Sequence, residues 1–102
     1  MIHNDIIESH NKTIANLCKT HKVKSLYAFG SVLTEKFNSH SDVDLIVDFQ
    51  KIEVLEYGDN YYSLKFALEK LLNRNIDLLE QKALKNPYFA SNINQTKKLI
   101  YG

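Results

Sequence analysis

Residues 41–49 read SDVDLIVDF and carry the strongest structural signal in the chain. Apolar side chains recur at every second position from Val43 to Phe49, which predicts a strand with one buried face. Asp42 and Asp44 then lie together on the opposite face. Ten residues earlier, Gly30-Ser31 follows another short apolar run. This segment therefore predicts two neighbouring strands that bring polar groups to one place.

Further elements are predicted on both sides of this segment. Apolar periodicity predicts helices at about residues 5–20 and 57–73, one or two helical turns at 31–36, and strands at 23–29 and 76–80. A last helix would begin at Pro87 and direct Phe89, Ile93 and Ile100 towards the core. The resulting order, α-β-α-β-α-β-α, predicts an α/β (α+β) fold with a small mixed three-stranded sheet and flanking helices.

Length and composition restrict the function classes. The 102 residues predict a single domain spanning 1–102, and 13 basic residues nearly balance 12 acidic ones, with a net charge of +1. A strongly basic nucleic-acid binder would differ, so no direct nucleic-acid binding is expected. No run approaches the ~18 apolar residues of a membrane span, so no membrane partner is expected. The single Cys18 and the lack of a signal peptide predict a cytoplasmic protein.

Asp42 and Asp44 are the candidates for a metal site. Two carboxylates ~4 Å apart repel by about 4 kcal/mol at an effective dielectric constant of 20. Either a bound metal ion neutralises them or the pKa of one carboxyl group rises, and the metal gives the better functional explanation. Mg²⁺ prefers oxygen ligands and keeps positions for waters and substrate phosphates. A turn that satisfies its own backbone explains Ser41 and Asp42 as well, but gives no reason for Asp44 inside an apolar strand.

Gly30 and Ser31 are the candidates for phosphate binding. Glycine between a strand and a helix allows close approach of the backbone to a ligand. Ser31 would begin a short helix whose free N–H groups attract an anion, and the same residue would also serve as a helix N-cap.

Asp77 belongs to the third predicted strand. If that strand lies beside residues 43–49, its carboxylate projects towards the same metal site. There it would bind a second metal or accept the proton of an attacking hydroxyl. Pairing with a lysine is the alternative for this residue.

In combination, these residues resemble a known family. Gly30-Ser31, ten residues, Asp42-x-Asp44 and a later carboxylate on a strand are similar to the signature of the DNA polymerase β-like nucleotidyltransferase superfamily. Residues 29–31, 41–45 and 76–79 resemble its minimal nucleotidyltransferase branch, and the similarity extends over nearly the whole chain.

The resemblance implies a nucleotidyltransferase fold and an enzyme that transfers a nucleotidyl group, usually AMP from ATP, with Mg²⁺. Asp42, Asp44 and Asp77 would be its catalytic and metal-binding residues, and Gly30 and Ser31 would bind the nucleotide triphosphate. Many such small proteins resemble antitoxins encoded beside a helical HEPN-type toxin, which some inactivate by AMP transfer to a tyrosine.

One part of the signature differs. The branch usually continues Gly-Ser-x-Ala-Arg-Gly, whereas Val32-Leu33-Thr34-Glu35 follows Ser31 here. The missing arginine favours one rival, a catalytically inactive antitoxin that neutralises its partner by contact alone. A small-molecule nucleotidyltransferase is a further alternative. Because a catalytic core of 102 residues leaves little surface for an acceptor, a helical partner or an oligomer is expected.

Overall fold

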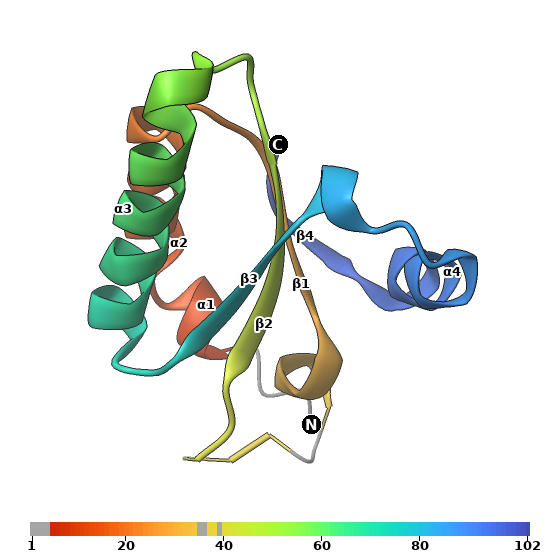
Figure 1. Ribbon diagram of the computed structural model, residues 1–102. Helices are drawn as coiled ribbons and strands as arrows, with labels where there is room; N and C mark the ends of the chain where they lie inside the picture. The colour runs from red at the N-terminus through yellow and green to blue at the C-terminus, as the bar shows by residue number, and fades with distance from the viewer. Residues whose placement is uncertain (1–4, 35–36, 39) are drawn as a thin grey trace.

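The computed structural model of the chain describes residues 5–34, 37–38 and 40–102. These residues form a four-stranded sheet with helices on both sides (Figure 1). The elements, in chain order, are α1 (Asp5–Glu8), α2 (Asn11–Thr20), β1 (Val23–Phe29), the 3-10 helix η1 (Gly30–Leu33), β2 (Val43–Phe49), α3 (Val54–Leu72), β3 (Ile76–Glu80), the 3-10 helix η2 (Gln81–Ala83), α4 (Pro87–Thr96) and β4 (Lys98–Tyr101). The predicted α/β architecture is confirmed.

The sheet is mixed, in the order β3-β2-β1-β4. Strand β1 pairs antiparallel with β2 and with β4, whereas β2 pairs in parallel with β3. A parallel pair needs a long crossover, and the 19-residue helix α3 provides it. The predicted bounds of β1, β2 and β3 agree with the structure at both ends.

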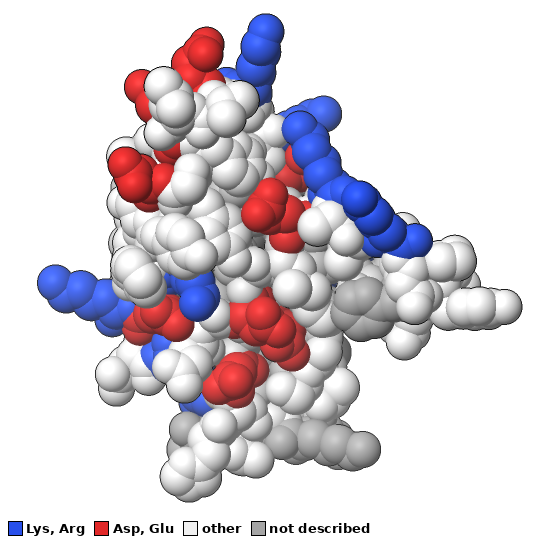
Figure 2. Space-filling model, in the orientation of Figure 1, with Lys and Arg blue, Asp and Glu red and all other residues white. Residues whose placement is uncertain are grey.

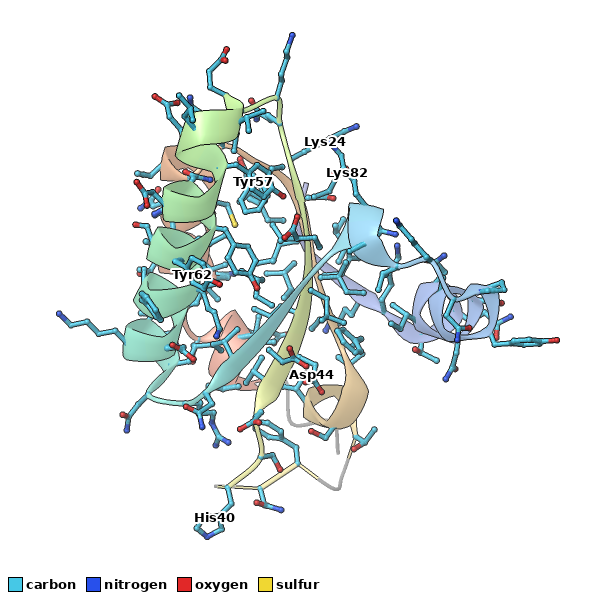
Figure 3. The ribbon with its side chains drawn as sticks, viewed as in Figure 1. Lys24, His40, Asp44, Tyr57, Tyr62 and Lys82 are labelled. Atoms are coloured by element: carbon cyan, nitrogen blue, oxygen red, sulfur yellow. The ribbon has the colours of Figure 1, made fainter. Side chains whose placement is uncertain are left out.

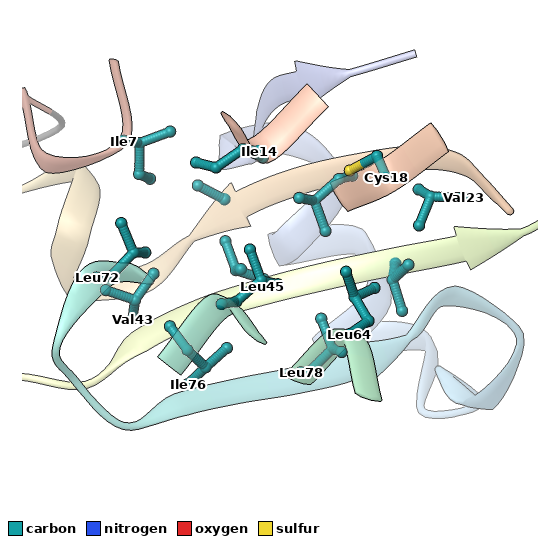
Figure 4. Close-up of a cluster of buried hydrophobic side chains, with 14 of the residues drawn as sticks. Ile7, Ile14, Cys18, Val23, Val43, Leu45, Leu64, Leu72, Ile76 and Leu78 are labelled. Carbon is teal, nitrogen blue, oxygen red and sulfur yellow. The ribbon is translucent and has the colours of Figure 1, made fainter. Parts of the chain in front are cut away.

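The main core lies between the sheet and helices α1, α2 and α3 (Figure 4). Val43, Leu45 and Val47 face it from β2, which is the alternation that the sequence predicts. Leu64 and Leu68 of α3 are fully buried against them. Within the described ranges, no helix combines the length and the apolar character needed to cross a membrane.

Two predicted elements need correction. The sheet has four strands rather than three, because the last helix ends at Thr96 and Lys98–Tyr101 pairs with the free edge of β1. Ile100 therefore lies on a strand, not on a helix, while the side chain of Phe89 is outside the described part of the structure. The predicted helix 5–20 is also broken, into α1 and α2.

The break between α1 and α2 has a local cause. His10 donates its backbone N–H to the Ile7 carbonyl, and its ring Nδ1 lies 2.9 Å from the Ile6 carbonyl oxygen. Side chains that bond to a nearby backbone in this way compete with the regular helical ladder. The short α1 thus ends at Glu8, two residues short of the start of α2.

Candidate active site at the Asp44 edge of the sheet

The paired positions of β2 and β3 bring two predicted site residues together. Asp44 and Asp77 are register partners in this parallel pair, so their side chains leave the sheet on the same face. That face is opposite to the one formed by Val43 and Leu45, which pack in the main core. Asp42, exposed, immediately precedes β2. Figure 3 shows Asp44 near η1, and Figure 2 shows acidic side chains grouped on this side of the molecule.

The three carboxylates influence one another electrostatically. Burial raises the pKa of the Asp44 carboxyl above its ordinary value of 3.8, and the charges of Asp77 and then Asp42 raise it further. Each cause disfavours a negative charge at Asp44, so the group gains from a cation nearby. The fold therefore pairs Asp44 with Asp77 and places Asp42 near enough to raise the pKa of Asp44.

The carboxylates lie near one another but do not by themselves form a complete metal-coordination site. Across residues 5–34, 37–38 and 40–102, no three His, Cys, Asp or Glu side chains are grouped closely enough to hold a metal ion. Charge repulsion acts over longer distances than coordination bonds. The carboxylates can therefore raise the pKa of Asp44 although they are too far apart to share a metal ion as they stand. A magnesium ion commonly completes its shell with waters and substrate phosphates, so these side chains suit an ion that arrives with a nucleotide.

Gly30 is in contact with this site through its backbone. It has φ +75, and a Cβ atom at this position would collide with Oδ2 of Asp44 and lie 3.3 Å from its Cγ. Phe29, the preceding residue, is the register partner of Asp44 in the β1–β2 pair. Only glycine combines this backbone conformation with this proximity. The exposed Gly30 backbone therefore borders the Asp44 carboxylate directly.

Ser31 lies in a turn that is shorter than the predicted helix. η1 is a 3-10 helix of four residues, Gly30–Leu33, anchored by the fully buried Val32. The Ser31 carbonyl accepts hydrogen bonds from the N–H and the hydroxyl of Thr34, both at 2.9 Å. Thr34 stands where the family signature has arginine. Residues 35–36 of the predicted helical turns are outside the described residues.

Arg74 is the residue near this site that the sequence analysis missed. Its position after the long helix is typical of a solvated charge. In the structure, its Nη1 atom donates hydrogen bonds to the carbonyls of Asn38 at 2.7 Å and Ser41 at 2.9 Å. Both acceptors are close in sequence to Asp42. Local periodicity carries no signal for contacts between residues more than 30 positions apart.

Comparison with known proteins places the chain in a family. The family model described as "Polymerase beta, Nucleotidyltransferase" matches residues 12–102. The chain is 32% identical over 97 residues to a predicted protein adenylyltransferase of Methanocaldococcus jannaschii, covering 95% of this chain and 91% of that protein. The similarity therefore includes both the strands and the helices around the site.

Solved structures of nucleotidyltransferases share the fold of this chain. A predicted minimal nucleotidyltransferase superposes with a TM-score of 0.76 and 26% identity, covering 92% of each chain. A tri-AMPylated Shewanella oneidensis HEPN toxin in complex with MNT antitoxin matches with a TM-score of 0.62 and 18% identity, over 94% of this chain and 72% of that chain, which shows a shared fold. The chain belongs to the polymerase β nucleotidyltransferase family, and the enzyme class predicted from its sequence is confirmed.

Proposed function

We propose that this protein is a Mg²⁺-dependent nucleotidyltransferase that transfers AMP from ATP to a hydroxyl group. The observation that carries the proposal is the pairing of Asp44 with Asp77 beside the Gly30 backbone. Carboxylates suit the cation, and a bare backbone suits the phosphates that the cation accompanies. Membership of the nucleotidyltransferase family supports the same reaction class.

Asp42, Asp44 and Asp77 would hold the magnesium, as one ion or as a pair. Burial, and then the charges of Asp77 and Asp42, raises the pKa of Asp44, and the ion would offset this cost of ionisation. When bound, magnesium supplies charge neutralisation at the phosphate oxygens and an orienting template for the triphosphate.

The remaining roles follow from position. Gly30 and Ser31 would bind the triphosphate through the backbone and the Ser31 hydroxyl. Asp77 would accept the proton of the acceptor hydroxyl. That oxygen forms a bond to the α-phosphorus while the bond from the α-phosphorus to the bridging oxygen breaks and pyrophosphate leaves. Positioning and electrostatics are the main sources of catalysis in such a transfer.

The acceptor in this proposal is a tyrosine of a HEPN-type toxin, which makes the protein an antitoxin. Two observations on similar proteins support this choice: one relative is named as a predicted protein adenylyltransferase, and one structural match is an MNT antitoxin with an AMPylated HEPN toxin. The protein would then act in an oligomer with its helical partner.

The test is AMP transfer to the neighbouring gene product. ATP labelled at the α-phosphate, Mg²⁺ and the purified neighbour are incubated with wild type, Asp42→Asn, Asp44→Asn and Asp48→Asn. Asp48 lies on β2, four residues beyond Asp44 on the same side, and is the matched control. We expect label on a tyrosine of the partner, lost in Asp42→Asn and Asp44→Asn and kept in Asp48→Asn. Absence of label with wild type would overturn the proposal.

A contact-only antitoxin is the second candidate, and Thr34 in place of the signature arginine is the observation that favours it. If the toxin is inhibited equally by wild type, Asp42→Asn and Asp44→Asn without label transfer, the protein neutralises its partner by binding alone. Label transfer to a small acceptor such as an aminoglycoside would instead support a small-molecule enzyme.

A further inference from the structure

Arg74 holds the segment that leads into Asp42. We name this segment the Asp42 loop, meaning the described residues 37–38 and 40–42. One nitrogen of the guanidinium, Nη1, donates to the Asn38 and Ser41 carbonyls at 2.7 and 2.9 Å. Hydrogen bonds from a charged donor are stronger than neutral ones. Since Ser41 precedes Asp42 directly, Arg74 fixes the backbone next to this carboxylate.

The same guanidinium also contacts the beginning of the loop. Its carbon Cζ lies 4.3 Å from the centre of the Phe37 ring. Phe37 is 8% exposed and belongs to the main hydrophobic core. A planar guanidinium both stacks on an aromatic ring and donates in its own plane, which an ammonium group cannot do. The Asp42 loop is thus held between the core and Arg74.

Arg74 is itself placed by the end of α3. Asn73 ends this helix in the left-handed conformation, and the Arg74 N–H donates to the Glu69 carbonyl at 3.3 Å. One residue later, the Asn75 carbonyl accepts a hydrogen bond from the Val43 N–H at 3.1 Å. The parallel pairing that aligns Asp44 with Asp77 follows from there. The segment after α3 therefore supports both Asp42 and the Asp44–Asp77 pair.

From these contacts we infer that Arg74 is a positioning residue of the metal site, acting through the Asp42 loop. The inference rests on the proposed function, in which Asp42 is a metal ligand. Removal of Arg74 would take away the hydrogen bonds to the Asn38 and Ser41 carbonyls, so the backbone before Asp42 would be held less firmly, while the bond from Val43 to Asn75 remains. The affinity for a divalent cation would fall while the sheet and the core stay intact.

The test measures Mn²⁺ binding to the protein by the decrease of the free Mn²⁺ signal in electron paramagnetic resonance, first without nucleotide and then with a non-hydrolysable ATP analogue, against the same analogue without protein. The variants are Arg74→Ala, Arg74→Lys, Asp44→Asn and Lys70→Ala. Lys70 is the matched control, because it is exposed and lines the same open cleft of about 550 Å³ as Asp42 and Arg74. Its removal changes the charge of the cleft by the same amount. Circular dichroism reports whether each variant is folded.

We expect Arg74→Ala to weaken Mn²⁺ binding about tenfold, at the lower end of the 10- to 100-fold loss seen when a group that orients a metal ligand is removed. Arg74→Lys, which keeps the charge without the planar fork, should lie between Arg74→Ala and wild type, and Lys70→Ala should equal wild type. If Arg74→Ala and wild type bind Mn²⁺ with equal affinity while Asp44→Asn binds it more weakly, the role of Arg74 is overturned and the metal site is not. An equal loss in Lys70→Ala would overturn it too, since a general charge effect would then suffice. No Mn²⁺ binding by wild type under either condition would overturn both the inference and the metal site of the proposed function.

Discussion

Asp44 and Asp77 occupy directly paired positions on two parallel strands, separated in the sequence by the whole of α3. Their carboxylates share one face of the sheet, and Asp44 is partly buried there. Without a cation, this arrangement opposes ionisation of Asp44. The pair therefore lowers the free energy of unfolding at neutral pH, and it also forms a site that attracts positive charge.

Asp44→Asn should unfold at a higher temperature than wild type at neutral pH when no divalent cation is present. The pKa of Asp44 in the folded state is raised above 3.8, so its protonated form favours folding and this benefit disappears as the pH rises through the raised pKa. Below 3.8 the carboxyl is protonated in both states, and the two proteins should converge. Thermal unfolding monitored by circular dichroism across this pH range is the measurement. Equal melting temperatures at neutral pH would contradict the cost assigned to Asp44.

Gly30→Ala should destabilise the fold and remove catalytic activity. The left-handed backbone at φ +75 costs about 1–2 kcal/mol for a residue with a Cβ, and this Cβ would also displace the Asp44 carboxylate. Urea unfolding and the AMP-transfer assay measure the two effects. Gly58→Ala is the control, because Gly58 lies inside α3 and a Cβ there meets nothing within 4 Å. It should stabilise the helix by about 0.5–1 kcal/mol.

Tyr57→Phe should lower stability without changing nucleotide transfer. The Tyr57 hydroxyl donates to Glu80 Oε2 at 2.5 Å, linking α3 to the end of β3 away from the site. Burial, followed by this hydrogen bond, raises the pKa of Tyr57, so the donor stays protonated across the physiological range. Losing a hydrogen bond to a charged acceptor should cost about 1–2 kcal/mol at this partly exposed position. Tyr62→Phe, at a residue 54% exposed on the same helix, should leave the urea midpoint unchanged.

Cys18 should not react with alkylating reagents in the folded protein. The side chain is fully buried, and burial raises the pKa of its thiol to about 12, so almost no thiolate exists at pH 8. Mass spectrometry after iodoacetamide treatment should show unmodified protein in buffer and complete modification in denaturant. Rapid labelling without denaturant would mean that α2 opens away from the core.

The sequence predicted most of the fold because its strands carry strong local patterns. The alternation in residues 43–49 and the short apolar runs of β1 and β3 depend only on neighbouring residues. The four residues of β4 gave no such signal. Their strand state comes from hydrogen bonds to the edge of β1, and Ile100 fits a helical spacing equally well.

The candidate site divides in a similar way. Gly30, Asp42, Asp44 and Asp77 were identified from residue types and spacing, since carboxylates near a glycine turn are chemically recognisable in a linear sequence. Arg74 was not, because its two acceptors are backbone carbonyls 33 and 36 residues earlier. Backbone acceptors have no residue type that a sequence pattern could detect.

The sequence alone determined which chemical groups are available and which strands carry them, because both depend on residue identity and short-range periodicity. Only the tertiary structure decided that Asp77 lies in register with Asp44, that the Gly30 backbone borders the same carboxylate, and that Arg74 anchors the Asp42 loop. The parallel pairing of β2 with β3 brings Asp77 there. This pairing requires the crossover through α3, and register and packing are properties of residues far apart in the chain.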